Sequence, residues 1–233
     1  MILSIMQPAY LPWLGYLHRL AISDVHVVLD SVPASKGDYC NRNRIRTAQG
    51  WTWLSVPLLG DRITTPICEL QVDTKQQWAQ RHWRSIEHAY RRAPYFDRYA
   101  ATMRDALTSS VQGLESACMR ALGPLLEAFE IRSAFAYSRD FGLSEKKSDL
   151  VLRICQETGA STYISGPLGR GYLDREAFDR AGIAVRFHDY VHPSYDQLYP
   201  GFEPNMCALD ALFNCGPQAR AVMERAQPEP ATA

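Results

Sequence analysis

The 233-residue sequence lacks several features that would place a protein in a special class. No two of its six cysteines stand in a C-x-x-C pair, so neither a zinc ribbon nor a thioredoxin-like motif is indicated. No apolar run approaches the ~20 residues of a membrane-spanning helix. Residues 1–6 are apolar without a basic segment before them, which predicts a buried strand rather than a signal peptide. These absences favour a cytoplasmic protein with reduced cysteines and no membrane partner.

The sequence also has no excess of charge of either sign. Lysine plus arginine number 25 and aspartate plus glutamate number 25, so the formal net charge is zero. General binding to nucleic acid and a polybasic membrane anchor both need an excess of cations, so this balance argues against both. A local basic patch remains compatible with it.

The order of apolar patterns predicts the fold class. A buried strand at residues 2–6 precedes a helix carrying Leu14, Leu17 and Ala21 at helical spacing, and a β-branched strand follows at 25–29. Strand, helix and strand in about thirty residues form a βαβ unit with parallel strands. A second such series follows, with strands at 133–137, 162–165 and 183–187 and helices at 144–156 and 174–181. The sequence therefore predicts an α/β fold with a Rossmann-like, mostly parallel sheet flanked by helices.

The middle third has a different period. Two strands are predicted at 51–58 and 67–72, and residues 74–132 then follow a helical pattern. We expect a helical insertion there, as a layer or subdomain of a single domain that covers residues 1–225. A last helix ends at Gly216, and the Pro- and Ala-rich tail 226–233 is expected to be disordered.

Polar and aromatic side chains gather in four loops that follow predicted strands. These loops are residues 7–16, 30–44, 165–174 and 188–197. Ligands of parallel sheets bind beyond the carboxyl ends of the strands, so the four loops predict one small-molecule site without a cofactor. The candidate substrate-binding residues are Gln7, Tyr10, Trp13, Tyr16, Lys36, Asn41, Arg42, Arg44, Ser165, Gly166, Tyr172, Tyr195, Gln197 and Asp210.

The first loop supports three interpretations. Tyr10, Trp13 and Tyr16 offer ring faces with polar tips for stacking on a ligand. The loop is similar to the H-x-G-H loop of nucleotidylyl transferases, but Trp13 and Tyr16 stand where the two histidines would be. The same rings could instead form an aromatic plug that caps the sheet.

The second loop indicates an anionic ligand. Arg42 and Arg44 present planar forks for phosphate or carboxylate, and Lys36 adds a point charge. A solvated basic loop paired with nearby aspartates is the structural alternative. Cys40 lies beside these arginines and would be a nucleophile if their charge lowered its pKa.

The third and fourth loops suggest phosphate binding and proton transfer. Ser165 and Gly166 begin a glycine-rich turn that could cradle a phosphate with backbone N–H groups. His192 is the candidate general base, oriented by Asp189 or Asp30. A metal site through His188 and His192, or two histidines that cap strand ends, remain alternatives.

These motifs together resemble the WbqC-like protein family, from Ile5 to Gly216. The motifs that carry the resemblance include Gln7-Pro8-x-Tyr10-x-Pro12-Trp13-x-Gly15-Tyr16, Asn41-Arg42, Tyr163-Ile164-Ser165-Gly166, His192-Pro193-x-Tyr195-x-Gln197 and Leu209-Asp210-x-Leu212-Phe213-Asn214. Tyr39 stands where a Trp is usual, and Cys207 where a Ser is usual.

The resemblance implies a biosynthetic role, in surface polysaccharides such as O-antigen or in natural products. It points to a transferase that modifies an amino sugar or related metabolite by acyl or aminoacyl transfer, with an acyl or aminoacyl donor or carrier as partner. Two alternatives stay open: a non-catalytic ligand-binding or scaffold protein of a biosynthetic complex, and a nucleotidylyl transferase-like enzyme.

Overall fold

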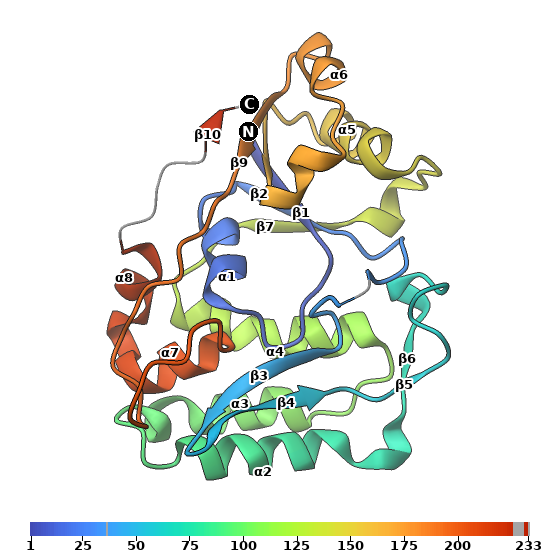
Figure 1. The fold of residues 1–233 in the computed structure, drawn as a ribbon. Coiled ribbons are helices and arrows are strands. Elements are labelled where there is room, and N and C mark those ends of the chain that lie inside the picture. Colours follow the sequence, from blue (N-terminus) through green and yellow to red (C-terminus); the bar gives the residue numbers. More distant parts are fainter. Residues whose placement is uncertain (36, 226–230, 233) are drawn as a thin grey trace.

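The computed structural model describes residues 1–35, 37–225 and 231–232, and a six-stranded sheet in the order β10-β9-β8-β1-β2-β7 crosses its upper half (Figure 1). Its parallel strands are β1 (Ile2–Met6), β2 (Val25–Val28), β7 (Ala134–Tyr137), β8 (Thr162–Ser165) and β9 (Ala184–Phe187). The short β10 (Ala231–Thr232) runs antiparallel to β9. The predicted α/β fold with a mostly parallel sheet is confirmed.

The two faces of the sheet carry different side chains. Along β1, Leu3 and Ile5 join a hydrophobic core with residues of α5 (Lys147–Glu157) and α6 (Arg175–Arg180). Side chains alternate along a strand, so Ser4 points to the opposite face, toward α1 (Leu14–Ala21). There its hydroxyl bonds to Nδ1 of His26 at 2.9 Å, and both residues are buried. The face toward α1 therefore holds polar groups next to the strand ends.

The lower half of the molecule is mainly helical (Figure 1). Its elements are β3 (Arg42–Thr47), β4 (Gly50–Ser55), β5 (Leu58–Leu59), β6 (Gln71–Val72), α2 (Trp78–Tyr90), α3 (Phe96–Thr108), α4 (Leu114–Ala128), α7 (Ala208–Cys215) and α8 (Ala219–Glu224). Short 3-10 turns are η1 (Ile67–Glu69), η2 (Thr74–Gln76), η3 (Ser138–Phe141), η4 (Pro167–Gly171) and η5 (Gly216–Gln218).

The expected helical insertion is present as α2, α3 and α4. One hydrophobic core joins it to α1 and α7, through side chains such as Leu17, Ile86, Leu122 and Leu212. The β1–α1 loop is therefore held between the sheet and the helical layer. No helix in the described part of the chain is long and apolar enough to cross a membrane.

Several predicted boundaries need correction. The expected loop 30–44 gives way at Arg42 to strand β3, in which Asn43 and Ile45 are buried and the arginines alternate with them. The strand predicted at 67–72 is a 3-10 turn followed by β6, with two strand residues only. In the tail predicted to be disordered, 231–232 form β10, whereas 226–230 and 233 lie outside the described residues.

Candidate functional site

A hollow of about 480 Å³ lies at the carboxyl ends of β1 and β8. From β1 the chain proceeds to β2 on one side, and from β8 it proceeds to β9 on the other. These neighbouring strands therefore form a topological switch point, where α/β sheets bind ligands. The volume is typical of small-molecule sites. We call this hollow the strand-end pocket; its polar and aromatic lining comprises Gln7, Trp13, Tyr16, Arg19, Ser35, Asp38, Tyr39, Cys40, Tyr163, Ser165 and Tyr172.

Arg19 of α1 supplies the positive charge of the pocket. Its guanidinium lies so close to Gly166 that a Cβ there would come within 2.9 Å of Nη2. None of the ion pairs among the described residues includes Arg19. Burial lowers its pKa, which means that the surroundings do not compensate the charge fully. A partly buried guanidinium without a carboxylate is suited to an anionic ligand.

Two histidines form a hydrogen-bonded chain with Arg19. Its Nε donates to Nδ1 of His188 at 3.4 Å, so His188 carries its proton on Nε2. That proton is then donated to Nδ1 of His18, at 2.8 Å. Burial, followed by the charge of Arg19, lowers the pKa of His188 to about 3. Burial also lowers the pKa of His18. Both rings are therefore neutral at pH 7. His188 orients Arg19 as an uncharged partner, and His18 in turn holds His188.

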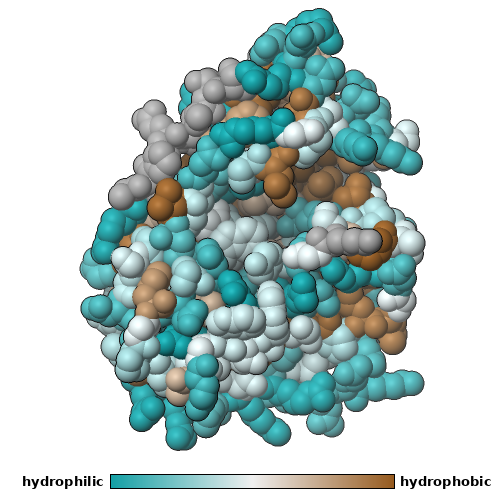
Figure 2. All heavy atoms as spheres, in the orientation of Figure 1, coloured by the Kyte–Doolittle hydropathy of each residue, from teal (hydrophilic) through white to brown (hydrophobic). Residues whose placement is uncertain are grey.

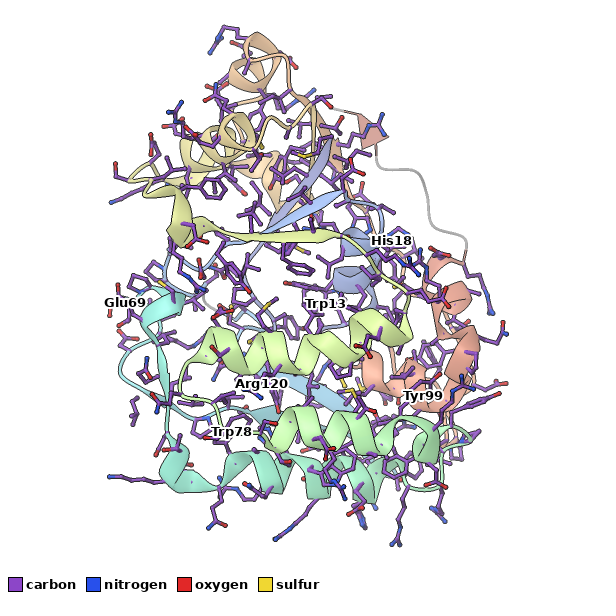
Figure 3. All side chains as sticks on the ribbon, turned by 180° about the vertical axis from the view of Figure 1, so that it is seen from behind. Trp13, His18, Glu69, Trp78, Tyr99 and Arg120 are labelled. Carbon is purple, nitrogen blue, oxygen red and sulfur yellow. The ribbon has the colours of Figure 1, made fainter. Side chains whose placement is uncertain are left out.

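Aromatic rings form much of the wall. The Trp13 ring lies 5.7 Å from that of Tyr16 and 5.1 Å from that of Tyr39. In Figure 3 Trp13 lies between β7 and α4, and His18 projects from α1. Burial raises the pKa of the Tyr16 hydroxyl, which lies 3.5 Å from Nε2 of His26, so it is a neutral hydrogen-bonding group. Tyr172 is 46% exposed and remains accessible at the mouth.

Asp38 and Cys40 are the reactive groups that line the pocket. Oδ1 of Asp38 accepts a hydrogen bond from Arg62 at 2.5 Å, whereas its buried Oδ2 has no partner among the described residues. Burial and then the Asp38 charge raise the pKa of Cys40, which keeps it a thiol at neutral pH. This disfavours the hypothesis that Cys40 is a nucleophile.

The structure brings together six of the predicted site residues. Gln7, Trp13, Tyr16, Ser165, Gly166 and Tyr172 all line the strand-end pocket. Tyr10, by contrast, is fully buried, and its hydroxyl bonds to Nδ1 of His82 at 2.9 Å. A side chain closed inside the helical core cannot stack on a ligand, so the expectation for Tyr10 is corrected. Lys36 lies outside the described residues.

The predicted catalytic group is not assembled. Nδ1 of His192 bonds to the carbonyl of its neighbour Pro193 rather than to an aspartate. Asp189 forms an ion pair with Arg170 at 2.6 Å, and Asp30 forms one with Arg139 at 2.5 Å. Both carboxylates are therefore engaged elsewhere, and the expected orientation of His192 by either of them is wrong.

The remaining predicted residues lie outside the strand-end pocket, in a cluster around Asp210 and along β3 with the segment before it. Tyr195 and Gln197 each donate to Oδ2 of Asp210 at 2.8 Å, so Asp210 pairs with them and not with Arg42 or Arg44. Asn41 donates to the carbonyl of Val56, and the two arginines extend along β3. No group of three or more metal-ligating side chains forms among the described residues.

Sequence reasoning missed Arg19, Tyr39 and Tyr163. Arg19 was not selected from the sequence, because its position depends on Gly166, which is distant in the chain. Its one signal was that it is the single Lys or Arg on the otherwise apolar α1.

Another hollow of about 480 Å³ lies against α3, α4 and α8. Of the two arginines that line it, Arg220 pairs with Glu224 at 2.6 Å and Arg98 lies over the Tyr99 ring at 5.5 Å. This hollow is also built away from the carboxyl ends of the strands. The strand-end pocket is therefore the stronger candidate.

The model of the WbqC-like protein family matches residues 7–222. The chain belongs to the WbqC-like protein family. It is 35% identical over 219 residues to the uncharacterized protein Rv1507c of Mycobacterium tuberculosis, covering 93% of this chain and 94% of the relative. No solved structure matches the chain. The matched region of this WbqC-like protein contains the β1–α1 loop, Arg19 and the β8 turn, and therefore most of the pocket.

Proposed function

We propose that this WbqC-like protein is a transferase of the acyl or aminoacyl type. Its acceptor would be an amino sugar or related metabolite with an acidic group, in the biosynthesis of a surface polysaccharide or natural product. The observation that carries the proposal is the Arg19 guanidinium, which faces the strand-end pocket without a carboxylate among the described residues. A cation in that position favours an anionic ligand.

The pocket offers a role for each part of such a substrate. Arg19 binds the anionic group, and Trp13 and Tyr172 cover the ring of the metabolite. Asp38 forms an ion pair with Arg62 through Oδ1, but its Oδ2 has no partner among the described residues, and this second oxygen accepts a proton from the acceptor amine. The amine nitrogen forms a bond to the donor carbonyl carbon, and the bond from that carbon to sulfur or oxygen breaks. The leaving group departs with the bonding electron pair.

A thermal-shift screen of purified protein tests the binding step. The ligand classes are nucleotide sugars, amino-sugar phosphates, acyl-CoA thioesters, aminoacyl donors and nucleoside triphosphates. A ligand at ~100 times its Kd stabilises the fold by about 2.7 kcal/mol, a shift of several degrees. We expect Arg19→Gln to lose the shift. Arg153→Gln should keep it, because Arg153 pairs with Glu157 on the surface of α5.

Equal shifts in wild type and Arg19→Gln would contradict the proposal, as would no shift with any class. A shift with nucleoside triphosphates alone would favour nucleotidylyl transfer instead.

A non-catalytic ligand-binding protein is the second candidate. The raised pKa of the Cys40 thiol disfavours covalent catalysis through this cysteine, so transfer in the pocket would depend on Asp38. Asp38→Asn separates the two candidates. A transferase should lose turnover and keep its thermal shift in this variant, whereas a binding protein shows no turnover in either form.

A further inference from the structure

The β3–β4 hairpin presents a second cationic surface beside the strand-end pocket. Arg42, Arg44 and Arg46 share one face of β3, because side chains alternate along a strand. On β4, Trp53 pairs with Arg44 and Trp51 pairs with Arg46, which places both indoles on that same face. The indoles are 43% and 37% exposed at Trp51 and Trp53. We call Arg42, Arg44, Trp51 and Trp53 the hairpin face.

The three arginines of β3 differ in how their hydrogen bonds are used. Arg46 is buried and donates to the carbonyls of Thr47, Gly50, Pro200 and Gly201, so its role is structural. Arg44 makes a single side-chain bond of this kind, to the Asn205 carbonyl at 3.3 Å.

Arg42 and Arg44 leave most of their donors free for a ligand. Their guanidinium carbons lie 4.6 Å from the Trp53 ring and 4.9 Å from the Trp51 ring. None of the ion pairs among the described residues includes either arginine. Nε of each is buried without a partner there, and among the terminal Nη groups only Nη2 of Arg44 forms a hydrogen bond within the described part of the chain, so it is the Nη groups that are available to a ligand. Stacking on indoles orients these forks without neutralising them.

The hairpin face is continuous with the pocket wall. The Tyr39 ring lies 5.1 Å from Trp13 inside the pocket and 6.1 Å from Trp53 on the hairpin. Figure 2 looks onto this side of the molecule, where apolar brown surface gathers below α5 and α6 and pale surface covers β3 and β4. One elongated ligand can therefore contact both regions.

The chemistry of the hairpin face matches a nucleoside diphosphate. Two neighbouring arginine forks suit two adjacent phosphates, which they can bind bidentately. An exposed indole offers a surface for a nucleobase. A longer nucleic acid would need an extended row of cations, and the chain as a whole has a net charge of zero.

We propose that the hairpin face binds the nucleoside diphosphate group of a substrate whose other end occupies the strand-end pocket. The proposal rests on the proposed function for the identity of that other end. It narrows the substrate class to a nucleotide-linked metabolite or a nucleotide-containing acyl donor, because both contain a nucleoside diphosphate group.

Isothermal titration with UDP, ADP and pyrophosphate tests the site directly. We expect UDP or ADP to bind wild type, more weakly at higher salt, and pyrophosphate to bind less tightly than the nucleotide. Arg42→Gln and Arg44→Gln should each weaken binding on the order of tenfold, as expected for a charged hydrogen bond. Arg84→Gln, on exposed α2, is the matched control and should bind as wild type does.

Two further variants distinguish a loss of ligand binding from a loss of folding. Arg42→Lys with Arg44→Lys keeps the charge and loses the forks, so it should recover part of the affinity and all of the thermal stability. Trp53→Ala should weaken nucleotide binding more than pyrophosphate binding. Equal affinity of wild type and the Arg42→Gln, Arg44→Gln double variant would overturn the proposal. So would binding of polyglutamate in place of nucleotides, because it would make the face a docking site for an acidic protein.

The two proposals fail in different ways. Nucleotide binding that persists in Arg19→Gln and disappears in the hairpin double variant supports the hairpin site alone. Ligand binding that depends on Arg19 and not on Arg42 or Arg44 leaves the proposed function standing and removes this inference. A UDP-sugar that binds more tightly than UDP in wild type, and equally with UDP in Arg19→Gln, supports both.

Discussion

Two polar clusters lie at the same carboxyl edge of the sheet, and they differ in whether their charged group has an ion-pair partner within the protein. After β2, Asp30 accepts hydrogen bonds from the Ser138 hydroxyl at 3.0 Å and the Arg139 backbone at 3.2 Å, and it pairs with the Arg139 guanidinium. Beyond β1 and β8, Arg19 has neutral histidines behind it and none of the described carboxylates as an ion-pair partner. The first cluster is closed within the protein, and the second is open toward a pocket.

The comparison separates structural from functional polar groups. Both clusters contain residue types that favour a site when only the sequence is read. A buried charged group whose hydrogen bonds are all made within the protein stabilises the fold. A charged group that lacks an ion-pair partner and lies next to a hollow is available to bind a ligand. The predictions below test this distinction.

The largest expected effect is on stability at the closed cluster. Asp30→Ala should lower the free energy of unfolding by about 2–3 kcal/mol, because it removes the buried carboxylate that accepts from the Ser138 hydroxyl and the Arg139 backbone N–H and leaves these donors unpaired. Urea denaturation at pH 7.5 measures the change. Asp179→Ala, on the exposed surface of α6, is the control and should stay within about 0.5 kcal/mol. A loss below 1 kcal/mol at Asp30 would show that the cluster is not a structural pair.

The open cluster should respond in the opposite way. Arg19→Gln removes a partly buried charge that has no carboxylate partner among the described residues, so the unliganded protein should keep its stability within about 1 kcal/mol. The same variant should lose the ligand-induced thermal shift. Urea denaturation with and without ligand measures both quantities. A destabilisation as large as that of Asp30→Ala would assign Arg19 a structural role and remove the contrast.

Local patterns predicted much of this fold. The apolar runs of β1, β2 and β8 and the helical periodicity of α1, α2 and α4 are contained in contiguous segments, so the sequence alone indicates them. Strand β3 was missed because one of its two faces carries three arginines, so its sequence does not show the usual alternation of polar and apolar residues. The indoles that pack against Arg42 and Arg44 are known only from the tertiary structure.

The site was harder to predict than the fold. Trp13, Tyr16 and Ser165 were found because they directly follow strands that end at the same edge. His192 was selected for its residue type, but its exposure and partners depend on the fold. Arg19 was missed because its neighbours Gly166 and His188 come from the far end of the chain.

Acid should destabilise the protein by a moderate amount for each of three buried histidines. The pKa values of His26 and His188 are lowered to about 3, and that of His82 to about 4, in each case first by burial. The unfolded chain takes up these protons near pH 6.5, before the folded protein does. Stability is therefore complete above pH 6.5 and is lost as the pH falls, by about 1.4 kcal/mol per pH unit for each histidine.

Urea denaturation at pH 7.5, 6.0 and 5.0 measures this slope. His26→Asn should reduce it by the contribution of one proton. Equal slopes in wild type and His26→Asn would show that His26 takes up its proton at the same pH in the folded and the unfolded protein.

The smallest effect concerns the thiols. Cys40 lines the strand-end pocket but is 2% exposed, and burial raises its pKa. Cys68 is only partly buried. Iodoacetamide at pH 7.5 should therefore modify Cys68 before Cys40, as followed by peptide mass mapping. Modification of Cys40 first would identify an accessible thiolate within the pocket. That result would restore Cys40 as a nucleophile and would replace proton transfer to Asp38 with covalent catalysis as the chemistry of the open cluster.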